Sequence, residues 1–242
     1  MPPKKKPRTP PAPRKVQAPK QRTNSSGGGL SSRTMLYVAA GIVVVALVAA
    51  GGFFAFAGSS SGGDKNVASL MAAAGCNYKT VKAHVPGGQT HVNSLTKKFP
   101  WNTDPPSNGQ HYPLWAVWGF YTAPVNPRMV VHNEEHGGVV LWWGTKVPPS
   151  TVDQLRSFYN EQSDGTFGTP YPKLGTKVAI SAWTGDPAKY RQNGYYGQGH
   201  LAICPRVDSA TLKAFEAFRK AYRGKGPEGI PLSLDKPGMG PQ

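Results

Sequence analysis

The sequence lacks the motifs of covalent catalysis and of phosphate binding. No Gly-x-Ser-x-Gly motif occurs in residues 67–234, the part expected to fold, and Cys204 precedes Pro205 in an apolar segment. The glycines of residues 194–199 lack the strand–loop–helix context and the lysine of a phosphate-binding loop. No internal repeat is visible. The sequence therefore identifies neither a covalent enzyme nor a nucleotide-binding loop.

Acidic residues are scarce, above all near the N-terminus. Residues 1–34 contain nine lysines or arginines and no acid, and they supply +9 of the formal net charge of +16. A basic segment rich in proline, serine and glycine cannot bury a core, so we expect it to be disordered. It has no groups for reading or stacking on bases, which makes nucleic acid an unlikely partner. A proline-recognising partner stays open, but the simpler interpretation is a cytoplasmic tail attracted to anionic lipid.

Charge is absent from residues 35–57. These 23 residues would reach about 35 Å as a helix, enough to cross a bilayer. A signal peptide would lie closer to the start of the chain. The pattern predicts a single N-terminal transmembrane helix in the cell membrane, with the N-terminus cytoplasmic and the C-terminal part extracytoplasmic. Residues 58–66, which are rich in glycine and serine, predict a flexible linker.

Cysteine is limited to Cys76 and Cys204, both on the side expected to face outward. In an oxidising compartment an even pair of cysteines favours one disulfide. Two unpaired thiols, one of them a metal ligand, are the alternative. The interpretation preferred here is a disulfide that ties the start of the domain to one of its late strands.

The folded domain is expected within residues 67–234, a length sufficient for one core. Residues 177–183 and 200–204 are typical of buried strands, and residues 150–162 and 208–223 have apolar side chains at helical spacing. This mixture predicts an α+β fold, in which a small, mostly antiparallel sheet carries two packed helices.

The remaining segments are less regular. Residues 84–127 combine proline, glycine and aromatic side chains, which predicts a long, ordered, turn-rich segment. Residues 129–143 consist of two apolar runs around a polar, glycine-containing connection, which predicts a hairpin or a bent pair of strands. Residues 235–242 predict a disordered tail.

Histidines are concentrated in one stretch. His91, His111, His132 and His136 lie within 46 residues, and imidazole is the commonest metal ligand in proteins. A spacing of four residues places His132 and His136 on the same side of the chain. We therefore expect a metal site formed by His111, His132 and His136, with His91 or Glu135 completing or supporting it. Nitrogen ligands of this kind suit zinc or copper.

Other roles for these residues stay open. The histidines could instead make structural hydrogen bonds, as buried polar groups usually do. A peptidase-type zinc motif, His-Glu-x-x-His on a helix, is disfavoured because Asn133 replaces the glutamate and two glycines follow His136. A metallohydrolase would use Glu135 as general base or as a partner that orients a ligand histidine.

The tryptophans predict a function of another class. Their faces could line a groove for a cell-envelope glycan or peptide in a metal-free binding or scaffold module. The simpler interpretation places most of them in the core, although Trp142 and Trp143 should face opposite sides of one strand. The tryptophans concerned are Trp101, Trp115, Trp118, Trp142 and Trp143.

Two motif blocks stand out in the domain. The first contains Pro105, Pro106, His111 and Tyr112, and the second contains His132, Asn133, Glu135, His136, Gly137 and Gly138. These blocks resemble the bacterial DUF3105 family, whose function is unknown. The resemblance extends from about Cys76 to Gly229 and includes a Gly-Pro-Glu-Gly run near the end, and the chain departs from the family pattern at Ser107–Gln110, where a plain Ser-Gly is more usual. The resemblance implies a membrane-anchored or secreted domain and no particular reaction.

Overall fold

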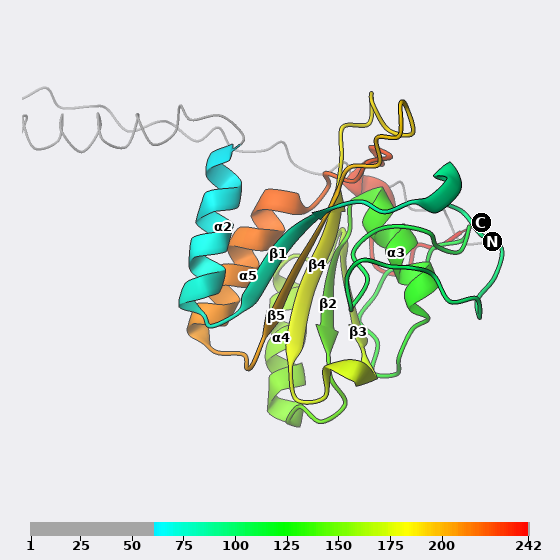
Figure 1. Ribbon diagram of the computed structural model, residues 1–242. Helices are drawn as coiled ribbons and strands as arrows, with labels where there is room; N and C mark the ends of the chain where they lie inside the picture. Colours follow the sequence, from blue (N-terminus) through cyan, green and yellow to red (C-terminus); the bar gives the residue numbers. More distant parts are fainter. Residues whose placement is uncertain (1–60, 242) are drawn as a thin grey trace, which may run out of the picture. The chain divides into compact units, whose positions relative to one another are not determined.

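The computed structural model describes residues 61–241, which form a mixed α+β domain (Figure 1). Short 3-10 helices occur at Pro86–Gly88, Pro172–Leu174 and Leu232–Leu234. The longer elements, in chain order, are α2 (Ser61–Ala73), β1 (Asn77–Lys82), α3 (Pro127–His136), β2 (Val139–Trp143), α4 (Pro149–Glu161), β3 (Thr166–Pro170), β4 (Val178–Thr184), β5 (Gln198–Cys204) and α5 (Ser209–Tyr222).

The five strands form one sheet in the order β1-β5-β4-β2-β3. β1 pairs with β5, β5 with β4, and β4 with β2, all antiparallel, and β3 is parallel to β2. The central strands are buried on both faces, as their near-continuous apolar sequences require.

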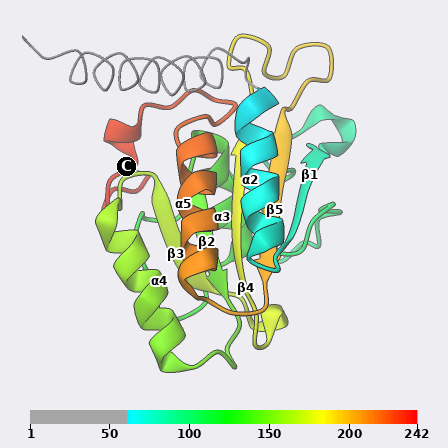
Figure 2. The ribbon, with the colours of Figure 1, turned by 90° about the vertical axis from the view of Figure 1, so that its left-hand side faces the viewer.

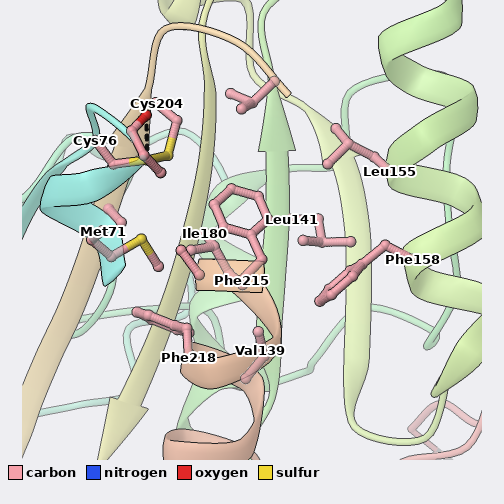
Figure 3. Packing of buried hydrophobic residues seen from close by; sticks show 14 of the residues in the cluster. Met71, Cys76, Val139, Leu141, Leu155, Phe158, Ile180, Cys204, Phe215 and Phe218 are labelled. Carbon is pink, nitrogen blue, oxygen red and sulfur yellow. Dashed lines mark hydrogen bonds between the residues drawn. A yellow bond between two sulfur atoms is a disulfide. The ribbon is translucent and has the colours of Figure 1, made fainter. Parts of the chain in front are cut away.

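Helices cover one face of the sheet, and α3 with the turn-rich segment covers the other (Figures 1 and 2). The first face packs against α2, α4 and α5, where Met71, Leu155 and Phe215 belong to one buried cluster with strand residues such as Ile180 (Figure 3). On the second face, α3 and the segment around Trp118 form a separate apolar cluster. The sheet is therefore the middle of three layers.

The predicted fold class is wrong in its number and kind of helices. Residues 61–241 include four α-helices rather than two, and none of them is long and apolar enough to cross a membrane. The predicted transmembrane helix at 35–57 and the basic tail at 1–34 lie outside these residues. The described residues thus form a five-stranded α+β domain with four α-helices.

Residues 129–143 do not form the predicted hairpin or bent pair of strands. They form α3 and then β2, although Val130 and Val131 have β-branched side chains that favour strands. Capping residues at both ends favour the helix over a strand. The side chain of Asn126 accepts a hydrogen bond from the backbone N–H of Arg128 at the start, and Gly137, at φ 113°, ends the helix in the left-handed conformation.

Helix α5 and strands β4 and β5 match the predicted segments closely. Asp208 caps α5 by accepting a hydrogen bond from the backbone N–H of Thr211. Helix α4 also matches, although Pro148 occupies its N-cap and makes no side-chain hydrogen bond there. These elements were predictable because their apolar periodicity agrees with their final burial.

The boundaries of the domain are wider than predicted. Helix α2 begins at Ser61, so residues 61–66 of the expected linker are helical. At the other end, Asp235 is buried, and the backbone of Trp118 exchanges hydrogen bonds with Gly238 and Met239. The described part of the predicted C-terminal tail therefore belongs to the packed structure.

A disulfide joins Cys76 to Cys204, as predicted. It connects the residue that precedes β1 to the last residue of β5, across a sequence separation of 128 residues. Cys204 is fully buried in the helix-covered core (Figure 3). The bond therefore ties α2 and β1 to the rest of the sheet.

Replacing both cysteines should destabilise the domain. Because the bond closes a long loop, the Cys76→Ala, Cys204→Ala variant should lose about 2–5 kcal/mol of unfolding free energy, measured by urea denaturation. Reductant should shift the midpoint of the wild-type protein in the same direction and leave the variant unchanged. Equal midpoints for the oxidised wild-type protein and the variant would contradict the prediction.

Candidate metal centre

His91 and His111 are brought together by backbone pairing within the turn-rich segment. The two residues form an isolated parallel bridge, in which the N–H of His111 donates to the carbonyl of Thr90 at 2.8 Å and the N–H of Val92 donates to the carbonyl of His111 at 2.8 Å. Their ring centroids lie 4.9 Å apart. The segment thus holds both side chains beside α3.

Helix α3 supplies the other half of the centre. His132, Glu135 and His136 lie at helical positions i, i+3 and i+4 and therefore share one face. The neighbouring Asn133 is fully buried and has a structural role, because its side chain accepts from the N–H of Ala116 at 3.0 Å and donates to the carbonyl of Ala116 at 2.9 Å. Asn133 fixes the helix against the turn-rich segment.

Three imidazole nitrogens converge on one carboxylate oxygen. The Oε2 atom of Glu135 lies 3.2 Å from Nε2 of His91, 2.9 Å from Nε2 of His111 and 3.9 Å from Nε2 of His132. One ligand atom from each of these four residues lies within 4.8 Å of the others, a spacing that could hold a metal ion. Only the side chain of His91 has substantial exposure, 34%.

Two of the histidines are oriented by backbone carbonyls. The Nδ1–H group of His111 donates to the carbonyl of Gly109 at 2.8 Å, and that of His132 donates to the carbonyl of Tyr112 at 3.0 Å. These bonds leave Nε2 of each ring without a proton when the ring is neutral. Burial, with the nearby His111, lowers the pKa of His132 to about 3, so its ring is neutral at physiological pH. Nε2 of His111 is buried and makes no hydrogen bond.

The second oxygen of Glu135 has partners of its own. The hydroxyl of Tyr190 donates to Oε1, and Nη2 of Arg191 lies 3.4 Å from it. Burial by itself would raise the pKa of Glu135, but contacts with His111, His91 and Tyr190 outweigh it and hold the pKa well below its usual value. Glu135 is therefore an ionised carboxylate without exposed side-chain surface.

A second, smaller group lies next to the first. Ligand atoms of His132, His136 and Glu228 also lie within 4.8 Å of one another. Nε2 of His136 is 3.6 Å from Oε2 of Glu228, and its Nδ1 is 3.6 Å from Oδ1 of Asp235. Arg191 bridges the two groups, because Nη2 lies 3.0 Å from Glu228 and 3.4 Å from Glu135.

The glycines at the contact between α3 and the segment that carries Glu228 let the two backbones lie close together. A Cβ atom added at Gly226 would lie 2.2 Å from the backbone nitrogen of Gly137 and 2.4 Å from the carbonyl oxygen of Glu135. The N–H of Gly224 donates to the carbonyl of Gly137 at 2.9 Å. This close backbone contact requires glycine and positions Glu228 beside His136.

Glu134 has a different role, although it adjoins Glu135. It points toward β4, where the hydroxyl of Ser181 donates to its Oε1 and in turn accepts from Nε1 of Trp142 at 2.7 Å. Burial raises the pKa of Glu134 well above its usual value. A carboxyl group in this buried, hydrogen-bonded position belongs to the packing of α3 on the sheet.

Four of the five predicted site residues form the first group, and the fifth, His136, belongs to the second. Sequence reasoning missed Glu228, Asp235, Tyr190 and Arg191. Only Glu228 had a signal, since it lies in the Gly-Pro-Glu-Gly run of the family resemblance. The others come from segments with no motif of their own.

The tryptophans form core rather than a groove. Trp118, Trp142 and Trp143 are 1%, 0% and 4% exposed, and both faces of the strand that carries the last two are covered. Trp115 is partly buried, and its ring packs 4.7 Å from that of His136 and 5.5 Å from that of His132. Three of the five tryptophans proposed for an aromatic surface are thus unavailable to a ligand.

The arrangement of this site agrees with a family assignment. The family model described as "Protein of unknown function (DUF3105)" matches residues 91–231, more than half of the chain. The chain belongs to the DUF3105 family. The DUF3105 match includes both motif blocks and runs from His91 to a point just beyond Glu228. No curated protein and no solved structure matches the chain.

Asn133 should matter for stability rather than for ligand chemistry. Asn133→Ala removes both hydrogen bonds to Ala116 and leaves a buried N–H and a buried carbonyl without those partners, so it should cost about 1–3 kcal/mol. Chemical denaturation measures this loss. The control is Asn160→Ala on the exposed face of α4, which should change the unfolding free energy by less than about 0.5 kcal/mol. Similar values for the two variants would refute the structural role.

Proposed function

We propose that this DUF3105 domain binds a divalent transition metal ion through His91, His111, His132 and Glu135. One observation carries the proposal: His111 and His132 each donate Nδ1–H to a backbone carbonyl and direct Nε2 toward the same carboxylate oxygen. Metal-ligating histidines are typically oriented in this way by the hydrogen bond of the other ring nitrogen.

The close contact between His111 and Glu135 supports the same conclusion. Nε2 of His111 lies 2.9 Å from the ionised Oε2 of Glu135, and Nδ1 of the same ring already donates to the carbonyl of Gly109. A cation shared between the two atoms, either a proton on Nε2 or a metal ion, stabilises so short a contact. The absence of a hydrogen bond at this buried nitrogen is explained if it is a metal ligand.

The ligand set indicates which ions fit. Three imidazoles and one carboxylate suit zinc in a tetrahedral arrangement or copper(II) in a tetragonal one. Four protein ligands fill a tetrahedral zinc site, as in structural rather than catalytic sites. The proposal is therefore that the ion is held or carried, and it disfavours a hydrolase that uses this one ion with Glu135 as base.

The disulfide supports an extracytoplasmic location. Stable disulfides form in oxidising compartments and are rare in the cytosol, and Cys76 is bonded to Cys204 inside the core. We propose that the domain works outside the cytoplasm, where its histidines would meet metal ions available in the cell envelope.

The test is metal content of the full 242-residue chain after equilibration with zinc or copper(II) and removal of unbound ions. Elemental mass spectrometry should find at least one ion per wild-type chain. His111→Ala and Glu135→Gln should each lower affinity by more than about a hundredfold, since changes outside the ligand shell alone cost about 10–100-fold.

The matched control is His84→Ala, because His84 is exposed and lies outside both ligand groups. This variant should retain wild-type metal content. Near-UV circular dichroism establishes that each variant is folded. A folded wild-type protein that binds neither ion would refute the proposal and leave the histidines with structural hydrogen bonds.

A further inference from the structure

The six candidate ligands divide into two equivalent sets. One set contains His91, His111 and Glu135, and the other contains His132, His136 and Glu228. Each set has two imidazoles and one carboxylate, a combination that binds zinc in proteins with three protein ligands. His132 belongs to both groups of neighbouring ligand atoms, so it can serve either ion.

His136 has the surroundings of a metal ligand. Its Nδ1 faces Oδ1 of Asp235, a carboxylate without exposed surface, and its Nε2 faces Oε2 of Glu228, each at 3.6 Å. Neither oxygen of Asp235 makes a hydrogen bond. A buried carboxylate behind a histidine fixes the ring and strengthens it as a ligand in carboxylate–histidine–zinc arrangements. Asp235 would have this function once the contact tightens by a few tenths of an ångström.

Glu228 is also held in place independently of any ion. Arg191 lies 3.0 Å from its Oε1, which leaves Oε2 directed at His136. The backbone before it is fixed by the contact of Gly226 with Gly137. The side chain is 22% exposed, so an ion could reach this position from the surface.

We propose that the domain has a second position for a divalent transition metal ion, formed by His132, His136 and Glu228 and oriented by Asp235. The inference rests on the proposed function, because the first ion occupies the neighbouring position. When the second ion binds, it takes Nε2 of His132, and the first ion keeps His91, His111 and Glu135.

This sharing has an energetic consequence. The second ion removes one ligand from the first and places another double positive charge close to it. Its affinity should therefore be weaker, by about tenfold or more. With three protein ligands each, both ions would have open coordination positions, which a closed four-ligand zinc site lacks. With one ion bound, its four protein ligands would leave no free coordination position. With two ions bound, each ion could accept a further ligand.

The experiment is a calorimetric titration of the metal-free full-length protein with zinc, accompanied by elemental analysis at saturation. The wild-type protein should show two binding steps and two ions per chain. Glu228→Gln and His136→Ala should abolish the weaker step and retain the tighter one. His91→Ala should weaken the tighter step, and His84→Ala should leave both unchanged.

The outcomes separate this inference from the proposed function. One ion in the wild-type protein, with Glu228→Gln indistinguishable from it, would overturn the second position and leave the first intact. Two ions in the Glu228→Gln and His136→Ala variants would place the second ion elsewhere and would also overturn it. No ion in the folded wild-type protein would overturn both.

Discussion

The centre of this domain is organised by one buried charge. Glu135 has no exposed side-chain surface, and an ionised carboxylate in that position must be compensated by neighbouring groups. The compensation comes from His91 and His111 in the turn-rich segment, and from Tyr190 and Arg191 in the connection between β4 and β5. Segments that are distant in sequence therefore meet at Glu135, and the geometry of the histidines follows from its position on α3.

The fold supports this arrangement with short-range constraints on α3. Asn126 and Pro127 start the helix, Gly137 ends it, and Asn133 fastens it to Ala116. The sheet behind the helix is covered on its other face by α2, α4 and α5, so the site rests on a layer that is itself fully packed (Figure 2). Ligand positions held by a helix and by paired backbone are more rigid than positions on free loops. Such rigidity favours binding an ion with little reorganisation.

The sequence predicts several elements of the fold and most residues of the site, and each wrong or missing prediction has a physical cause. Helix α5 and strands β4 and β5 were predictable because local pattern and final burial agree. Helix α3 was not, because Val130 and Val131 resemble a strand, and the caps at both ends outweighed them. The histidines were recognisable because they are close in sequence. Glu228 had only the Gly-Pro-Glu-Gly run as a signal, because its position beside His136 depends on the close contact of Gly226 with Gly137. Asp235 had none, since it lies far from the histidines in the sequence.

The disulfide also affects which ligands compete for an ion. Cysteine thiolates are softer ligands than imidazole or carboxylate and bind zinc and copper(I) strongly. In this domain both sulfurs are bonded to each other, and no free cysteine occurs in the described residues. Oxidation thus withdraws the only thiols of the chain from metal chemistry. If the proposed ion binds, a newly made, still reduced chain would also offer it two thiols, so the order of oxidation and metal loading would decide where it is held.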